Sequence, residues 1–127
     1  MFDPWECVAA DWPGWQVEVS DIRPRRGLTI WATCTIVLDI GLTPTERRCT
    51  LTHELIHVER GPVPRDRWLK IREEREVRRL TAARLIDPER LADAMAWAED
   101  PREIAEIVGV DVRTLQWARV ETVGEHR

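Results

Sequence analysis

The sequence predicts an α+β fold, in which a small antiparallel or mixed three-stranded sheet packs on a pair of helices and a helical C-terminal part follows. Between residues 15 and 42, apolar and β-branched residues recur with a period near two, whereas helical spacing dominates after residue 42. The 127 residues are 43% hydrophobic, which suits a single domain with a modest core. We therefore expect one domain over 1–127, made of an N-terminal helix and sheet (1–42), a central helix pair (43–87) and C-terminal helices (88–127).

The first part of the chain is predicted to contain one helix and three strands. A short amphipathic helix occupies residues 1–14 and ends at Pro13-Gly14, a pair that interrupts helices. Alternating or β-branched residues predict strands at 16–20, 28–31 and 34–38. The turn at 23–27 carries three arginines, which we interpret as a solvated loop in preference to a phosphate or substrate contact.

Helix signals mark the rest of the chain. Thr43 can cap a helix that has Pro44 in its first turn, and helical spacing then continues to about Arg60. After a Gly-Pro break, further helices are predicted at about 65–86 and 88–99, and Pro101 opens two short final helices. The large and small apolar residues of these helices are expected in the core or as packing anchors: Trp68, Leu91, Ala94, Met95, Trp97 and Trp117.

Charge and cysteine content argue against several classes of protein. The net charge of −4 disfavours non-specific coating of nucleic acid, although a local basic patch is compatible with it. There is no apolar run of about eighteen residues, as a membrane span would need, and the start lacks the basic-then-apolar pattern of a secretory signal. Three widely spaced cysteines favour neither a disulfide framework nor an all-cysteine zinc site. We therefore expect a cytoplasmic protein.

The most specific motif is His-Glu-x-x-His at residues 53–57, inside a predicted helix. Histidines four residues apart project from the same face, so His53 and His57 can bind one metal ion. Glu54 lies beside them, where a carboxylate can accept a proton from metal-bound water. The opposite face carries an apolar stripe: Leu51, Leu55 and Val58. The histidines are therefore expected to face a cleft, and the alternative is a pair of ordinary surface histidines.

A catalytic zinc ion needs a third protein ligand and an open position for water. The next helix supplies Glu73, Glu74 and Glu76. At about 100° per residue, only Glu74 falls in the middle of the inward-facing stripe of that helix. Burial of a carboxylate in an apolar stripe raises the free energy of the folded protein unless the group is paired or bound to a metal. We therefore favour Glu74 as the ligand. The alternatives are a salt bridge from Glu74 to Arg78, four residues later, and the poorly placed His126 as ligand.

The stretch from residue 47 to about residue 88 resembles the ImmA/IrrE-like zinc metallopeptidases. Their pattern is a His-Glu-x-x-His helix, then a helix with a ligand glutamate, a small or acidic residue four positions on, and an alanine-rich end; the counterparts here are 53–57, 72–78 and 81–86. The resemblance implies a zincin-like helix pair with His53, His57 and Glu74 as zinc ligands and Glu54 as general base. Arg78 departs from the pattern, because the family usually has Asp or Asn there to orient a ligand histidine.

These residues predict a zinc-dependent metallopeptidase that cleaves a protein or peptide with metal-activated water. The resemblance implies that the substrate is a regulator or repressor in a bacterium or phage. When a peptide bond is hydrolysed, a negative charge develops on its carbonyl oxygen and usually needs a hydrogen-bond donor besides the metal. Many zinc peptidases use Tyr for this role, but the chain has no Tyr. Arginines are the candidates: Arg60, Arg78 and those of the 23–26 cluster.

A second hypothesis is a regulatory DNA- or protein-binding module with a structural or inactive zinc site. Residues 104–115 fit a helix-turn-helix template with Gly109 at the turn. Four side chains could then reach bases or phosphates: Arg113, Thr114, Gln116 and Arg119. Acidic residues dilute any basic face, so DNA is the less favoured partner. A third reading is a different metal-dependent hydrolase that uses the same helix.

Overall fold

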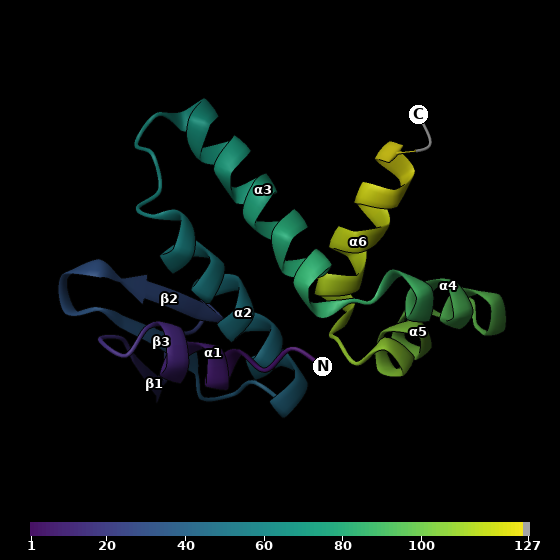
Figure 1. The fold of residues 1–127 in the computed structure, drawn as a ribbon, viewed down its shortest axis with the longest axis horizontal. Coiled ribbons are helices and arrows are strands. Elements are labelled where there is room, and N and C mark those ends of the chain that lie inside the picture. Colours follow the sequence, from purple (N-terminus) through teal and green to yellow (C-terminus); the bar gives the residue numbers. More distant parts are fainter. Residues whose placement is uncertain (126–127) are drawn as a thin grey trace.

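The computed structural model describes the backbone of residues 1–125 and the side chains of residues 1–118. The described elements are, in order, α1 (Pro4–Asp11), β1 (Gln16–Ser20), β2 (Gly27–Ile30), a 3-10 turn (Trp31–Thr33), β3 (Thr35–Asp39), α2 (Pro44–Arg60), α3 (Arg67–Leu85), α4 (Pro88–Trp97), α5 (Pro101–Val108) and α6 (Val112–Glu125). In Figure 1 the sheet, α1 and α2 lie at one end, α4 and α5 lie at the other, and α3 and α6 diverge between them. The fold is α+β, as the sequence predicts.

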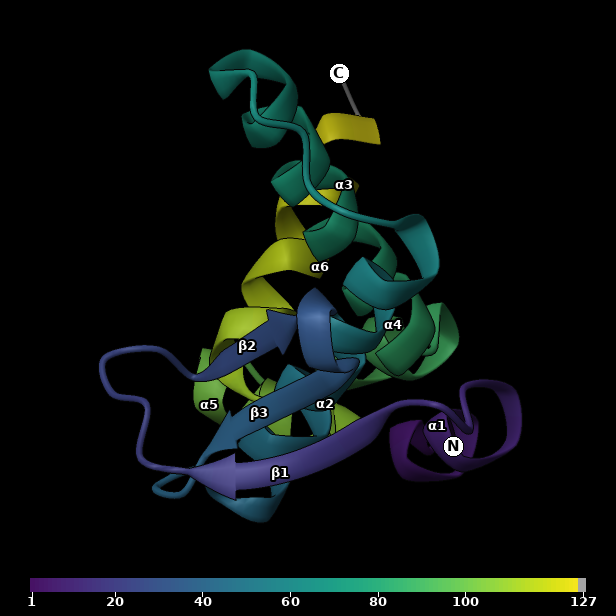
Figure 2. The same ribbon diagram turned by 90° about the vertical axis from the view of Figure 1, so that its left-hand side faces the viewer.

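The sheet is mixed, with the strand order β1-β3-β2. β3 runs parallel to β1 and antiparallel to β2, so that Ile36 lies opposite Val17 on one side and Thr29 on the other. Because β3 is the central strand, all of its residues are buried, whereas β1 is largely exposed. Figure 2 shows β2 as the edge strand on the side of α3 and α6. Of the two sheet types that the sequence allows, the structure has the mixed one.

α2 begins where the sequence predicts, because its N-terminus is capped twice. The hydroxyl of Thr43 accepts a hydrogen bond from the amide of Glu46, and the carboxylate of Glu46 accepts one from the amide of Thr43. One face of α2 packs against β2 and β3. With Val8 of α1, this face and β3 form one buried cluster: Val8, Ile36, Leu38, Leu51, Leu55 and Val58. Burial contributes about 1.5–3 kcal/mol for each large aliphatic side chain, which fixes the rotation of α2 about its axis.

α3 lies beside α2 on one side and α6 on the other. Asp66 caps its N-terminus by accepting hydrogen bonds of 3.0 Å from the amides of Trp68 and Leu69. Val77 and Thr81, four residues apart, are completely buried. The same stripe of α3, one turn earlier, therefore faces α2 at residue 74.

A second hydrophobic cluster lies among the C-terminal helices and the ends of α2 and α3. Its buried members are Cys49, Ala82, Leu85, Ile86, Leu91, Ala94, Ala98, Ile104, Ala105, Val108, Val110 and Leu115. Gly109 ends α5 in the left-handed conformation, with φ of 81°. Arg48 of α2 donates hydrogen bonds to the carbonyl of Gly109 at 2.8 Å and to that of Phe2 at 3.2 Å. This arginine thereby ties α2 to the N-terminus and to the turn before α6.

Three predictions of burial are wrong. Trp97 is 88% exposed, Trp68 is 72% exposed and Met95 is 45% exposed. The reason is that α4 packs along a narrow stripe, of which only Leu91 and Ala94 are buried. Trp97 and Trp68 stand at the ends of their helices, beyond the elements that cover them. Trp117, in contrast, is partly buried and packs against the second cluster.

Several element boundaries differ from the predictions, and the first helix is shorter than expected, since it covers Pro4–Asp11 rather than residues 1–14. The last strand begins at Thr35, because Cys34 adopts the left-handed conformation (φ 49°) after the 3-10 turn. α6 is not short, since it extends over 14 residues. Within the described residues, every helix is too short or too polar to cross a membrane.

Candidate metal centre

α2 carries both histidines of the motif on one face. His53 and His57 are one helical turn apart, and their ring centroids are separated by 5.0 Å. The opposite face of the helix is fixed by completely buried residues such as Leu51 and Leu55. The two imidazoles therefore face α3 rather than the sheet, as the sequence predicts.

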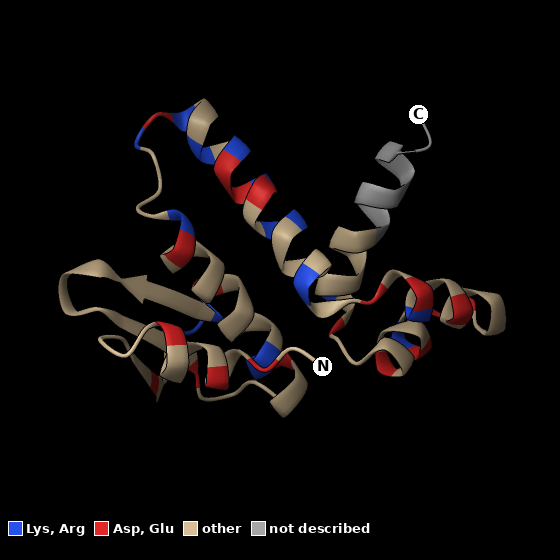
Figure 3. Cartoon of the chain, in the orientation of Figure 1, with Lys and Arg blue, Asp and Glu red and all other residues tan. Residues whose placement is uncertain are grey.

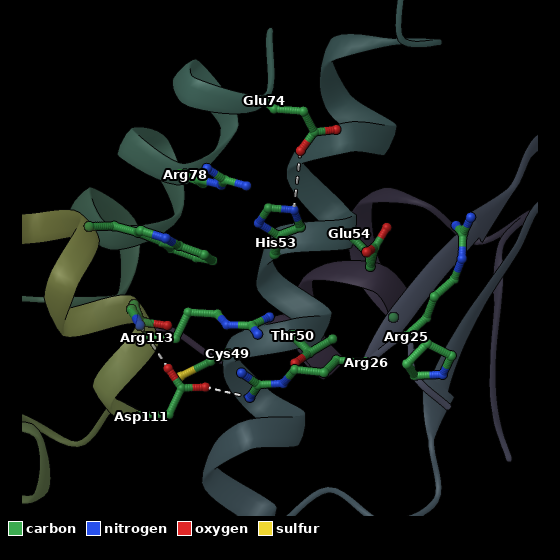
Figure 4. A pocket seen from close by; sticks show the side chains of 14 residues that line it. Arg25, Arg26, Cys49, Thr50, His53, Glu54, Glu74, Arg78, Asp111 and Arg113 are labelled. Atoms are coloured by element: carbon green, nitrogen blue, oxygen red, sulfur yellow. Dashed lines mark hydrogen bonds and ion pairs between the residues drawn. The ribbon is translucent and has the colours of Figure 1, made fainter. Parts of the chain in front are cut away.

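α3 brings the carboxylate of Glu74 to these imidazoles, and Figure 4 shows it beside that of His53. Its Oε1 atom lies 3.4 Å from Nε2 of His57, and its Oε2 atom lies 3.9 Å from Nε2 of His53. One ligand atom from each of the three residues lies within 4.8 Å of the others. Atoms bound at about 2.0–2.2 Å to a tetrahedral zinc ion are about 3.3–3.6 Å apart, so small side-chain shifts suffice. The group could hold a metal ion.

The other carboxylates of α3 have different partners. Glu73 forms an ion pair with Arg60 of α2, and Glu76 forms one with Arg79 on its own helix. Arg78, the alternative partner of Glu74, has its guanidinium carbon 5.9 Å from the ring centroid of Trp117. These contacts leave Glu74 as the acid of α3 that faces both histidines.

The environment of the three groups separates their proton affinities. Burial, together with the charge of His57, lowers the pKa of His53 to about 4. Burial also disfavours protonation of His57, but the hydrogen-bonded carboxylate of Glu74 and the charge of Glu54 outweigh it and raise the pKa of His57. The same hydrogen bond lowers the pKa of Glu74 below its ordinary range. Without a metal, Glu74 is therefore ionised and His53 is neutral, which are the forms that bind cations.

Glu54 lies next to the three residues and is 8% exposed. Its Oε2 atom accepts a hydrogen bond of 2.6 Å from the hydroxyl of Thr29 on β2. Burial raises the pKa of Glu54, and the bond from Thr29 opposes that shift. A carboxylate with a raised pKa beside a metal site can accept a proton from water and release it again.

Sequence reasoning missed two residues that hold Glu54 in place. The first is Thr29, whose hydroxyl binds the carboxylate. The second is Gly27, where an added Cβ atom would lie 2.6 Å from Cγ2 of Thr50 and 3.0 Å from Glu54. No local pattern identifies either residue, because both contacts join β2 to a helix more than twenty positions later. A glycine at the start of a predicted strand is the one signal that could have suggested close packing.

The imidazole of His53 lacks the partner that usually orients a metal-binding histidine. Its Nδ1 atom is buried and makes no hydrogen bond within the described part of the chain. Its ring instead lies against Trp117, with a centroid distance of 5.4 Å. Arg78, which cannot accept a hydrogen bond, stands four residues after Glu74. Packing against Trp117 thus restricts the orientation of the His53 ring, which an acidic hydrogen-bond partner does at many metal sites.

Two cavities flank the candidate ligands. One, of about 250 Å³, extends toward the N-terminal half of α2 and toward α6. The other, of about 290 Å³, extends along β2 toward the C-terminal end of α2. Both are lined by the same central residues: Arg25, Gly27, His53, Glu54 and Glu74. An extended chain that passed through both cavities would cross the candidate metal site.

The predicted helix-turn-helix is formed by α5, the turn at Gly109 and α6. Thr114 is 1% exposed and is therefore unable to reach a base. Arg113 lines the first cavity, beside the metal site. Acidic and basic residues are interspersed over α4 and α5 (Figure 3). The side chain of Arg119 and all of His126 lie outside the described residues.

Comparison with known proteins adds no relatives. No protein-family model matches the chain, and no curated protein matches it. The resemblance to the ImmA/IrrE-like metallopeptidases therefore depends on the motif residues alone.

Proposed function

We propose that the protein is a zinc-dependent metallopeptidase that cleaves a protein substrate. The observation that carries the proposal is the convergence of His53, His57 and Glu74, with Glu54 beside them. Two imidazoles and one carboxylate are a donor set that suits zinc and leaves a position for water. The resemblance to ImmA/IrrE-like enzymes adds that the substrate is a regulator or repressor of a bacterium or phage.

Each residue has a distinct role in this mechanism. His53, His57 and Glu74 would hold the ion, which, when bound, lowers the pKa of a water ligand and polarises a carbonyl. Glu54 accepts the proton of the attacking water and passes it to the leaving amine. Thr29 keeps the carboxylate of Glu54 directed at the site through the bond to its second oxygen.

The sheet offers a place for the substrate backbone. Among the described residues, β2 pairs with β3 alone, so its other edge, which Thr29 links to Glu54, has no strand beside it. An extended peptide can add to such an edge as a further strand.

The arginines that could stabilise the oxyanion divide into those that form ion pairs and those that do not in the described part of the chain. Arg60 pairs with Glu73, Arg23 pairs with Asp21, and Arg26 pairs with Asp111. The two that line the first cavity beside the candidate ligands, with no ion pair in the described part of the chain, are Arg25 and Arg78. Arg25 lines both cavities and is therefore the better placed donor for a carbonyl at their junction.

Metal content and cleavage test the proposal together. Purified protein should contain about one zinc ion per chain, and His53→Ala should lose it. His126→Ala, which removes the third histidine of the chain, is the matched control and should retain the ion. Glu54→Gln should keep zinc but lose cleavage of the substrate. Zinc content that is unchanged in His53→Ala would contradict the proposal.

The second candidate function is a regulatory DNA- or protein-binding module with a structural or inactive zinc site. The helix-turn-helix of α5 and α6, and Arg78 at the position of the usual acid, favour it. This function predicts salt-sensitive binding to duplex DNA that is lost in Arg113→Ala and Arg119→Ala. Absence of binding at low salt would reject the DNA-binding form. A different metal-dependent hydrolase would be distinguished by its substrate profile.

A further inference from the structure

The two cavities beside the candidate metal site differ in charge. The cavity along β2 has apolar residues at its far end: Leu28, Trp31 and Val63. The cavity toward α6 is lined by four arginines: Arg25, which lines both cavities, Arg26, Arg78 and Arg113. It also contains three carboxylates: the proposed base Glu54, the candidate ligand Glu74, and Asp111. The site is therefore asymmetric along the direction in which a peptide would cross it.

Among the side chains that the structure describes, these four arginines differ in their ion pairs. Arg26 binds Asp111 at 2.7 Å and lies 3.6 Å from Glu46. Arg78 and Arg113 form no ion pair in the part of the chain whose side chains are described. The guanidinium of Arg78 lies over the ring of Trp117, which holds it in place without cancelling its charge. Two cations from different helices thus remain directed at one small cavity (Figure 4).

We propose that this cavity binds a carboxylate of the substrate and that Arg78 and Arg113 determine this specificity. The inference rests on the proposed peptidase function, for which it names the class of substrate. A guanidinium can donate two parallel hydrogen bonds to a carboxylate, and two such groups from the neighbouring helices α3 and α6 can bind the same one. The cavity of about 250 Å³ is small for a cofactor and suits one or two side chains.

The carboxylate has two sources in a peptide. It belongs either to an Asp or Glu side chain near the cleaved bond or to the C-terminus of the substrate. The charge of the whole protein does not explain such a preference, because the chain carries a net charge of −4 and repels acidic peptides at long range. A preference for acidic peptides therefore reports on the local arginines.

Peptide binding to an inactive variant tests the proposal. Zinc-loaded Glu54→Gln protein is titrated with two pools of labelled octapeptides that differ by Glu or Gln at one fixed position among neutral residues. Each pool is made with a free and with an amidated C-terminus, so that the source of the carboxylate is identified. We expect at least one of the carboxylate-bearing pools to bind about tenfold more tightly than the amidated Gln pool.

Matched variants show which arginines are responsible. Arg78→Gln and Arg113→Gln, each added to Glu54→Gln, should remove most of the tenfold preference. Arg75→Gln is the control, because it removes the same charge from α3 but does not line the cavity. Equal binding of all pools, no binding of any pool, or an equal loss in Arg75→Gln would overturn the proposal. Thermal unfolding verifies that each variant is folded.

The same titration separates this inference from the proposed function. Zinc content is measured on every sample, and the pools are also titrated against metal-free protein. Absence of any acidic preference in Glu54→Gln protein that contains zinc overturns only the carboxylate site. A preserved preference in protein that never binds zinc supports the carboxylate site and contradicts the peptidase.

Discussion

The hydroxyl of Thr29 donates a hydrogen bond of 2.6 Å to the carboxylate of Glu54, and so joins the edge strand of the sheet to the helix that carries both histidines. The pair is separated by 25 positions in the sequence. Glu54 has little contact with solvent, so this hydroxyl is an important partner of a buried charge. The contact joins β2 to the side chain that we propose as the general base.

We expect Thr29→Val to lower kcat of the zinc enzyme by about tenfold, because a hydrogen bond to a charged group is worth about 1.5–3 kcal/mol. Zinc content should not change, since Thr29 is not among the candidate ligands. Thr29→Ser keeps the hydroxyl and serves as the control. The roles assigned to Thr29 and Glu54 would be wrong if Val and Ser supported the same kcat.

Removal of the candidate carboxylate ligand should weaken zinc binding. We expect Glu74→Gln to reduce zinc affinity by at least about a hundredfold, because a neutral amide replaces a charged ligand. Glu76→Gln, on the same helix but paired with Arg79, should bind zinc as the unmodified protein does. Competition with a chelator measures both constants, and equal affinities would exclude Glu74 as a ligand.

Zinc should also stabilise the fold. Binding to the folded state alone contributes about 4 kcal/mol at a free zinc concentration a thousand times Kd. The Tm of the unmodified protein should therefore rise with added zinc and fall again with a chelator. In His57→Ala the Tm should not respond to zinc, and a response of the same size would mean that the ion binds elsewhere.

Because β2 lies close to α2 at Gly27, any side chain at this position should lower the free energy of unfolding. A Cβ atom there would lie 2.6 Å from Cγ2 of Thr50, so Gly27→Ala should destabilise the protein by about 1–3 kcal/mol. Gly14→Ala is the matched control, because a Cβ atom at Gly14 would meet nothing within 4 Å. Denaturant unfolding compares the two, and equal free energies of unfolding would contradict the packing described here.

Asp111 is expected to stabilise the protein through two separate contacts. One carboxylate oxygen binds Arg26 at 2.7 Å, and the other accepts a hydrogen bond of 2.8 Å from the amide of Thr114 at the start of α6. Asp111→Asn keeps the second contact and should cost about 1 kcal/mol, whereas Asp111→Ala loses both and should cost about 2–3 kcal/mol. If the two variants were equally stable, the cap of α6 would contribute nothing.

The parts of the site that sequence reasoning located are those that depend on helix geometry within one element. The motif at His53 and His57 is local, and Glu74 follows from its place in a helical stripe. The N-cap at Thr43 followed by Pro44 is likewise a short-range pattern, and it predicted the start of α2 correctly.

The parts that it could not locate depend on contacts between distant elements. Thr29 and Gly27 matter only because β2 lies against α2. The exposure of Trp97 has the same origin, since helical period shows which residues share a face but not whether a neighbour covers it. The arginine-lined cavity needs α3, α6 and the loop before β2 to meet, and no sequence pattern contains that information.

The most direct test of the account is a crystal structure of the zinc-loaded protein with anomalous data collected at the zinc absorption edge. The account predicts one anomalous peak, within about 2.0–2.2 Å of Nε2 of His53, Nε2 of His57 and a carboxylate oxygen of Glu74. A peak at another site, or a peak bound by the histidines while Glu74 points elsewhere, would contradict it.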